Sequence, residues 1–289
     1  MPKIFSHLFL KLGLTFCVAA LLPLGQASAQ GAPAESDMYC AGMATTEAMP
    51  DDTYVISGEN SAYLSTFTQN QLVFINRGAD QGVKVGDQYE VVRAVHEPLK
   101  YKWFEWQPQL TLAMGTLYAD IGRLEVVNVQ AKTSTARVTM SCIMMQRGDL
   151  ARPMAPRPAP PYHSAGFDHF APPSGKNTAM VVVSKNFGQI NGAGNTVYVN
   201  LGTAQGVKVG DYFRVFRYQG TRTESAYQPR NTSYQLYGYG SPPVAYRWND
   251  LPRQVLGEGI VLRAGPNSST VLLTLANQEI YVGDYVELE

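Results

Sequence analysis

Aromatic side chains crowd two segments of the chain, and they are the residues best suited to bind a partner. The first segment, residues 101–106, contains Tyr101, Trp103, Phe104 and Trp106. The second, residues 227–248, contains Tyr227, Tyr234, Tyr237, Tyr239, Tyr246 and Trp248. Tyrosine and tryptophan supply large contact areas and are enriched at the energetic centres of interfaces. The sequence therefore predicts partner binding through Trp103, Phe104, Trp106, Tyr237, Tyr239 and Trp248; the alternative is that these rings only cover an open barrel end.

The sequence contains none of the common catalytic or metal-binding motifs that we sought. Beyond residue 29 the chain has three histidines: His96, His163 and His169. No Gly-x-Ser-x-Gly, His-Glu-x-x-His or Cys-x-x-Cys pattern occurs. His163, Asp168 and His169 share a proline-rich stretch, which is too sparse a ligand set to predict a metal site. The sequence predicts a non-enzymatic protein without a cofactor, with an enzyme assembled from residues remote in sequence as the third-ranked reading.

One heptapeptide, Gln-Gly-Val-Lys-Val-Gly-Asp, occurs twice, at residues 81–87 and 205–211. Its glycines are expected where the backbone needs positive φ or a close approach, and its aspartate where a turn needs an acceptor. Since no Gly-x-x-x-x-Gly-Lys-Ser/Thr pattern is present, we interpret the motif as a structural turn and not as a phosphate site. The predicted turn residues are Gly78, Gly82, Gly86, Asp87, Gly148 and Asp149 in the first copy, and Gly202, Gly206, Gly210, Asp211, Gly283 and Asp284 in the second.

The repeat sets the predicted domain organisation. Short segments rich in Val, Thr and Tyr flank each copy, which indicates strands. We predict an all-β chain of two tandem small SH3-like antiparallel β-barrels, at residues 52–152 and 178–289. Residues 30–51 form a lead-in. Residues 153–177 form a proline-rich linker with seven prolines, which predicts extended, semi-stiff backbone and partly independent barrels. Each aromatic segment follows the same strand of its repeat.

Residues 1–29 have the pattern of a secretory signal peptide. Lys3 and Lys11 precede or flank a short apolar core, and Ala27-Ser28-Ala29 forms a small-x-small cleavage site. This predicts export, with a periplasmic location and no transmembrane segment after signal removal. The remaining chain has 21 basic and 23 acidic residues, a balance that does not predict a nucleic-acid partner.

Two cysteines follow the predicted signal peptide, Cys40 in the lead-in and Cys142 near the end of the first repeat. Export places them in an oxidising compartment, where a disulfide persists. We expect a bond between Cys40 and Cys142; the alternative is two free, buried thiols.

The repeat resembles the C-terminal domain of the flagellar assembly protein T family. The shared pattern is Asn-x-Gly-x-x-x-Gly-Val-x-x-Gly-Asp-x-x-x-Val, at residues 76–91 and 200–215, followed by a Gly-x-x-x-Val stretch and a late Gly-Asp pair. The resemblance implies a small β-barrel in a secreted bacterial protein. The predicted function is non-catalytic binding or scaffolding at the cell envelope, with an envelope protein as partner. The alternative is a glycan-binding module that recognises peptidoglycan through the aromatic segments.

Overall fold

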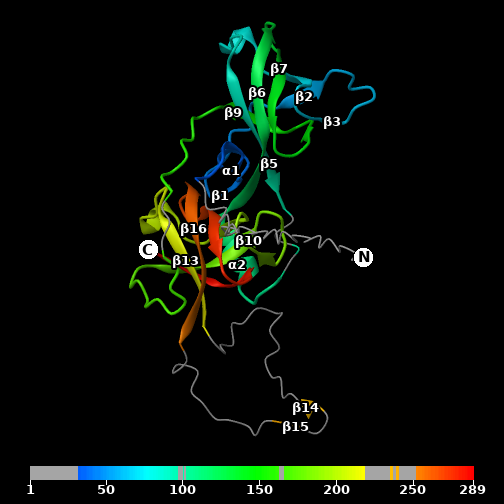
Figure 1. Ribbon diagram of the computed structural model, residues 1–289. Helices are drawn as coiled ribbons and strands as arrows, with labels where there is room; N and C mark the ends of the chain where they lie inside the picture. Colours follow the sequence, from blue (N-terminus) through cyan, green and yellow to red (C-terminus); the bar gives the residue numbers. More distant parts are fainter. Residues whose placement is uncertain are drawn as a thin grey trace, which may run out of the picture.

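The computed structural model describes residues 32–96, 100, 102–162, 166–218 and 252–289, and the backbone of residues 235–236 and 239–240. This part of the chain is mostly β-structure, as the sequence predicts. It forms two halves, and Figure 1 shows them stacked with α1 (Glu35–Tyr39) and β1 (Met43–Thr45) between them. The predicted signal peptide lies outside the described residues, as do Tyr237 and Trp248.

Short strands joined by turns make up both halves. The first half contains β2 (Val55–Gly58), β3 (Thr66–Phe67), β4 (Leu72–Ile75), the 3-10 helix η1 (Ala79–Gln81), β5 (Gln88–Val95), α2 (Gln107–Met114), β6 (Thr116–Val129), β7 (Ser134–Ser141), β8 (Met145–Gln146) and β9 (Leu150–Pro153). The second half contains β10 (Thr178–Ser184), β11 (Ile190–Asn191), β12 (Thr196–Val199), the 3-10 helix η3 (Thr203–Gln205), β13 (Tyr212–Tyr218), β14 (Gln235–Leu236), β15 (Tyr239–Gly240), β16 (Arg253–Ala264), β17 (Ser269–Ala276), β18 (Ile280–Tyr281) and β19 (Tyr285–Leu288).

The second half is a closed antiparallel barrel with the strand order β10-β12-β17-β16-β13-β19. The first half is a sheet with the corresponding order β2-β4-β7-β6-β5-β9, and β1 pairs additionally with β6. A single bridge between Tyr54 and Leu150 and the hydrogen bond from Ala151 N to Thr53 O (2.8 Å) bring the two end strands of this sheet together. Strand order is therefore the same in both halves, while the paired ladder closes fully only in the second.

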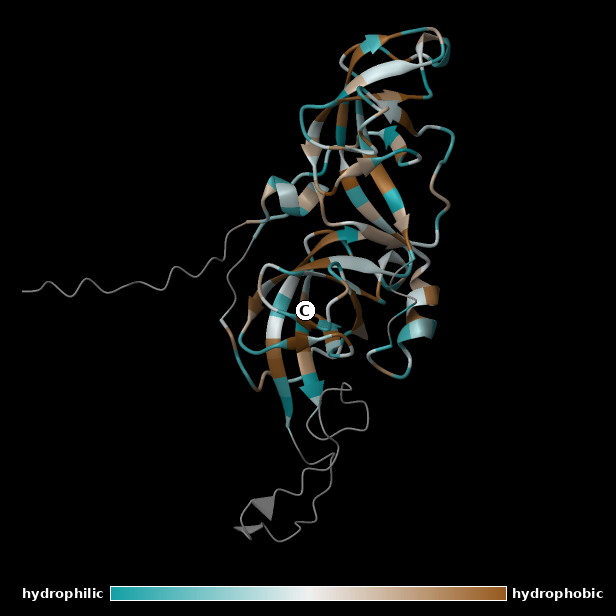
Figure 2. Ribbon diagram, turned by 90° about the vertical axis from the view of Figure 1, so that its right-hand side faces the viewer, coloured by the Kyte–Doolittle hydropathy of each residue, from teal (hydrophilic) through white to brown (hydrophobic). Residues whose placement is uncertain are grey.

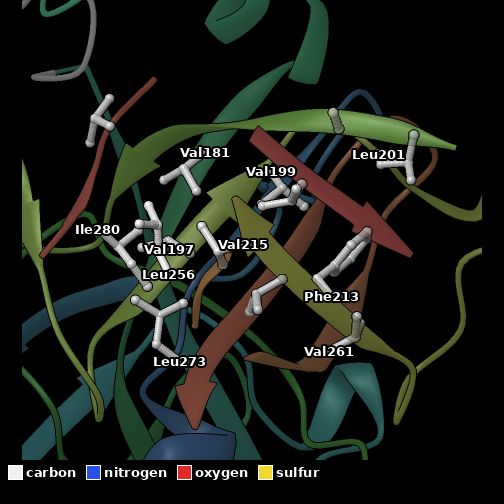
Figure 3. Packing of buried hydrophobic residues seen from close by; sticks show 14 of the residues in the cluster. Val181, Val197, Val199, Leu201, Phe213, Val215, Leu256, Val261, Leu273 and Ile280 are labelled. Carbon is white, nitrogen blue, oxygen red and sulfur yellow. The ribbon is translucent and has the colours of Figure 1, made fainter. Parts of the chain in front are cut away.

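The described residues form four clusters of buried apolar side chains: one inside each half, and two where the second half meets the lead-in and the region around α2. Val181, Val199, Val215 and Phe213 point into the second barrel and are almost fully buried, as Figure 3 shows. The first half has its own core, centred on residues such as Val91. Figure 2 shows the matching brown, hydrophobic strand segments in both halves. Burial of one such side chain contributes about 1.5–3 kcal/mol of stability.

The repeated heptapeptide is the same turn in both halves. Gly82 and Gly86 have φ angles of 81° and 93°, in the left-handed region that favours glycine. Gly78 has extended backbone instead, and a β-carbon there would collide with the carbonyl oxygens of Gln130 and Ala131. The carboxylate of Asp87 accepts a hydrogen bond from the amide of Lys84 at 2.8 Å, and Asp211 accepts the same bond from Lys208 at 2.8 Å. The matching glycines of the second half are Gly202, Gly206 and Gly210.

The late Gly-Asp pairs also serve the same purpose in both halves. Gly148 and Gly283 have φ angles of 86° and 106°. The carboxylate of Asp149 accepts two hydrogen bonds from Arg93, at 2.6 and 2.8 Å. Asp284 accepts two from Arg217, at 2.7 and 2.6 Å. Each pair ties the last turn to the strand that follows the heptapeptide. The sequence predicted the turns but not these arginines, although Arg93 and Arg217 occupy matching positions of the repeat.

A third set of matching positions carries opposite charges in the two halves. Glu90 on β5 lies opposite Arg152 on β9, with 2.7 Å between Oε1 and Nε. The same strands of the second half place Arg214 on β13 opposite Glu287 on β19, 3.1 Å apart. The cross-strand neighbour on the other side is also inverted, since Arg123 faces Glu90 and Glu258 faces Arg214. We call these two sets the inverted charge ladder.

Candidate functional site

The Cys40–Cys142 disulfide is present, as the sequence predicts, with 5.5 Å between the two Cα atoms. It attaches α1 to the turn after β7, and so fixes the start of the lead-in against the first half. Because the bond closes a separation of 102 residues, the chain-entropy account assigns it about 2–5 kcal/mol of stability.

Beyond the disulfide, the lead-in connects the two halves. Strand β1 pairs with β6 of the first half, with Met43 opposite Tyr118. Three hydroxyl groups of the second half donate hydrogen bonds to carbonyl oxygens of the lead-in: Tyr198 to Ala41 at 2.8 Å, Ser268 to Ala44 at 2.6 Å, and Thr270 to Gly42 at 3.1 Å. The lead-in therefore lies in a buried interface between the halves.

A carboxylate at the centre of this interface gathers charged groups from several segments. The Asp120 side chain on β6 is 4% exposed and accepts a hydrogen bond from the amide of Gly42 at 2.8 Å. Arg263 of the second half lies 3.2 Å from it, and Arg157 of the proline-rich segment lies 3.4 Å away. Burial raises the pKa of Asp120, while Arg263 and the Gly42 amide oppose that rise. Arg157 also pairs with Glu90, so the proline-rich segment is anchored at this point.

The first aromatic segment is part of the interface and not wholly a free loop. Phe104 is 8% exposed and belongs to the core of the second barrel, where a β-carbon on Gly283 would be in tight contact with its ring. Trp103 is partly buried against the same core. Thus the first half supplies an aromatic side chain that closes one end of the second barrel. For Phe104 this burial favours the alternative that the ring covers a barrel end, because the chain itself covers the ring.

A helix that the sequence did not predict follows this aromatic segment. Pro108 lies in the first turn of α2, where its missing amide costs nothing, and Gly115 ends the helix with a φ of 89°. The side chain of Gln107 donates a hydrogen bond to Val182 O at 2.9 Å, which joins α2 to β10. Trp106, at the start of the helix, stays 55% exposed. Of the predicted binding residues in the second segment, Tyr239 belongs to the short strand β15.

A cleft of about 370 Å³ opens beside the disulfide, between the two halves. Its apolar walls come from both halves and include Ala94, Val95, Leu117 and Phe187. Three charged side chains line it: Arg93, Asp120 and Lys185. Lys185 and Phe187 belong to no sequence motif, and the cleft exists only where the two halves meet, so the sequence did not predict it.

The described residues hold no cluster of three or more histidine, cysteine or carboxylate side chains arranged for a metal ion. In the same part of the chain, no helix has the length and apolar character needed to cross a bilayer. The cleft beside the disulfide has apolar walls with a few polar groups, a combination that suits the binding of a ligand.

No protein-family model matches this chain, and no curated protein matches it.

Proposed function

We propose that this chain is a non-catalytic binding or scaffold protein of the bacterial cell envelope. It consists of two tandem copies of one small barrel joined by the proline-rich segment 153–177, and residues 1–29 direct it to the periplasm. The common strand order supports this duplication, as do the Arg–Asp pairs at Asp149 and Asp284. The resemblance to the flagellar assembly protein T domain belongs to the same proposal.

One observation carries the proposal: the segments outside the barrels make contacts between the halves. The lead-in strand β1 and the Phe104 ring both do so. A fixed arrangement of two barrels suits a scaffold, because a rigid surface loses little conformational entropy when a partner binds. On the outside of α2, Trp106 and Leu112 remain 55% and 66% exposed. We assign partner binding to this α2 surface.

A photo-cross-linking amino acid at position 106, introduced in the native bacterium, tests this assignment. Tyr63, which is 91% exposed in the first half, provides a matched control position. We expect a discrete adduct from position 106 and none from position 63. Excess wild-type protein should compete for the adduct, whereas the double variant Trp106→Ala/Leu112→Ala should not. Equal adducts from both positions, or competition by the double variant, would refute the α2 surface.

The glycan alternative makes a different prediction for the same surface. Exposed tryptophan rings also stack on sugars, so Trp106 is the described residue that favours this reading. Purified peptidoglycan should then sediment with the wild-type protein and leave the Trp106→Ala variant in solution. Adduct formation without sedimentation supports a protein partner.

A further inference from the structure

The cleft between the halves has the size and walls of a small-molecule site. Its volume of about 370 Å³ lies within the range of roughly 300–1,000 Å³ that is typical of ligand pockets. Val95 and Leu117 line it from the first half, and Phe187 and Tyr198 line it from the second. A ligand bound there would contact both halves.

Two of the three charged groups that line the cleft are neutralised by the protein. Arg93 is held by both oxygens of Asp149. Asp120 is held by the Gly42 amide, Arg263 and Arg157. Lys185 is different, because within the described ranges its ammonium group is in no direct ion pair, and only the more distant charges of Asp120 and Asp37 act on it. The cleft therefore retains one unpaired positive charge.

The turn that carries Lys185 has an unusual backbone conformation. Phe187, two residues further on, has a φ of 58°, in a region that bulky residues rarely adopt. Its amide donates a hydrogen bond to Ser184 O at 2.9 Å, and this tight turn places Lys185, Asn186 and Phe187 together on the cleft wall. Backbone strain of this kind persists where the surrounding structure enforces it, and such places cluster at ligand sites.

We propose that the cleft binds a small anionic amphiphile, with a carboxylate or phosphate group paired to Lys185 and an apolar body between Leu117, Val95 and Phe187. An anion is the expected ligand because the unpaired charge is positive, and an apolar body is expected because the surrounding walls are apolar. Burial lowers the pKa of Lys185 and outweighs the opposing charges of Asp120 and Asp37, so the ammonium is poorly solvated and gains from an anionic partner in direct contact. This site is separate from the α2 surface and does not depend on the proposed scaffold role.

Calorimetric titration of the mature chain with four probes tests the proposal: octanoate, octyl phosphate, octanamide and inorganic phosphate. We expect octanoate or octyl phosphate to bind at least tenfold more tightly than octanamide, which has the same chain without the charge. Octyl phosphate should also bind more tightly than inorganic phosphate, because only the former has an apolar body. These comparisons use the wild-type protein and do not depend on any variant folding.

Three variants then locate the site. Lys185→Met keeps the aliphatic stem and should weaken octanoate binding at least tenfold, with octanamide binding unchanged. Ala94→Leu, which fills the cleft, should weaken both ligands. The exposed Lys208→Met variant is the matched control and should bind as the wild type does. Thermal denaturation checks that each variant is folded.

Several results would overturn the inference. Failure of both octanoate and octyl phosphate to bind the wild-type protein below their micellar concentrations would do so. Equal affinity for octanoate and octanamide would remove the role of the charge, and equal affinity for octyl phosphate and inorganic phosphate would remove the role of the apolar walls. Equal losses in the Lys185→Met and Lys208→Met variants would place binding elsewhere.

Discussion

Truncation of Phe104 to alanine separates the structural role of the first aromatic segment from a binding role. The ring is 8% exposed and packs within the core of the closed barrel that the second half forms, although the residue belongs to the first half of the chain. Phe104→Ala should therefore destabilise the protein by removing a core side chain. If the ring served a partner instead, the same change would leave the free energy of unfolding almost unaltered.

The expected loss follows from the burial of the ring. Phenylalanine-to-alanine changes in protein cores cost about 3–5 kcal/mol, since transfer free energy is lost and a cavity remains. Phe104 closes the end of a barrel, where solvent reaches the vacated space more easily than in a central position. We therefore expect a decrease of about 3 kcal/mol, at the lower end of that range. For a chain of this size that corresponds to a fall of roughly 6–12 °C in Tm.

Urea denaturation followed by circular dichroism measures the loss, and Trp106→Ala is the matched control. Trp106 lies two residues away but is 55% exposed, so its removal should change the free energy of unfolding by less than about 0.5 kcal/mol. Similar stabilities for the Phe104→Ala variant and the wild type would refute the reasoning. So would a larger loss from Trp106→Ala than from Phe104→Ala.

Two further predictions concern the disulfide and the Glu258 carboxylate, whose pKa is raised. Replacement of Cys40 and Cys142 together by serine should lower the free energy of unfolding by about 2–5 kcal/mol, and reductant should then have no further effect on the urea midpoint. Burial, followed by the nearby Glu289 carboxylate, raises the pKa of Glu258 from 4.5 to about 7. The folded protein thus holds a proton that the unfolded chain has released, so stability falls as pH rises between these values. Glu258→Gln should remove that fall, about 1 kcal/mol after allowance for solvent screening, in urea titrations at pH 4.5 and 7.5. An unchanged pH dependence in this variant would contradict the assignment.

Local sequence signals predicted the elements that depend on local geometry. Gly82 and Gly86 adopt positive φ angles because the turn needs them, and Asp87 accepts the hydrogen bond expected of a turn aspartate. The Cys40–Cys142 bond was predictable because only two cysteines follow residue 29. The turn inferences needed only the identity of a few neighbouring residues, and the disulfide inference needed only the number of cysteines that follow residue 29.

Turn residues and the number of cysteines did not predict which residues distant in the sequence pack together. A cluster of aromatic residues has the same sequence pattern whether its rings face solvent or pack into the core of the other half. The sequence therefore left open whether Phe104 is buried. The ion cluster at Asp120 joins Arg157 and Arg263, which lie 37 and 143 residues away in the sequence. The Lys185 cleft depends on the same docking, and for that reason no sequence motif marked it.

The inverted charge ladder disfavours the exchange of strands between the two halves while the chain folds. Tandem domains of like sequence are prone to exchange strands during folding, because each strand finds an acceptable partner in the wrong copy. If β5 paired with β19, Glu90 would lie opposite Glu287, and if β13 paired with β9, Arg214 would lie opposite Arg152. Like charges directly opposite one another destabilise a sheet, and Glu90 and Glu287 are both buried. The opposite charges at these positions therefore favour strand pairing within each half and disfavour strand exchange between the halves.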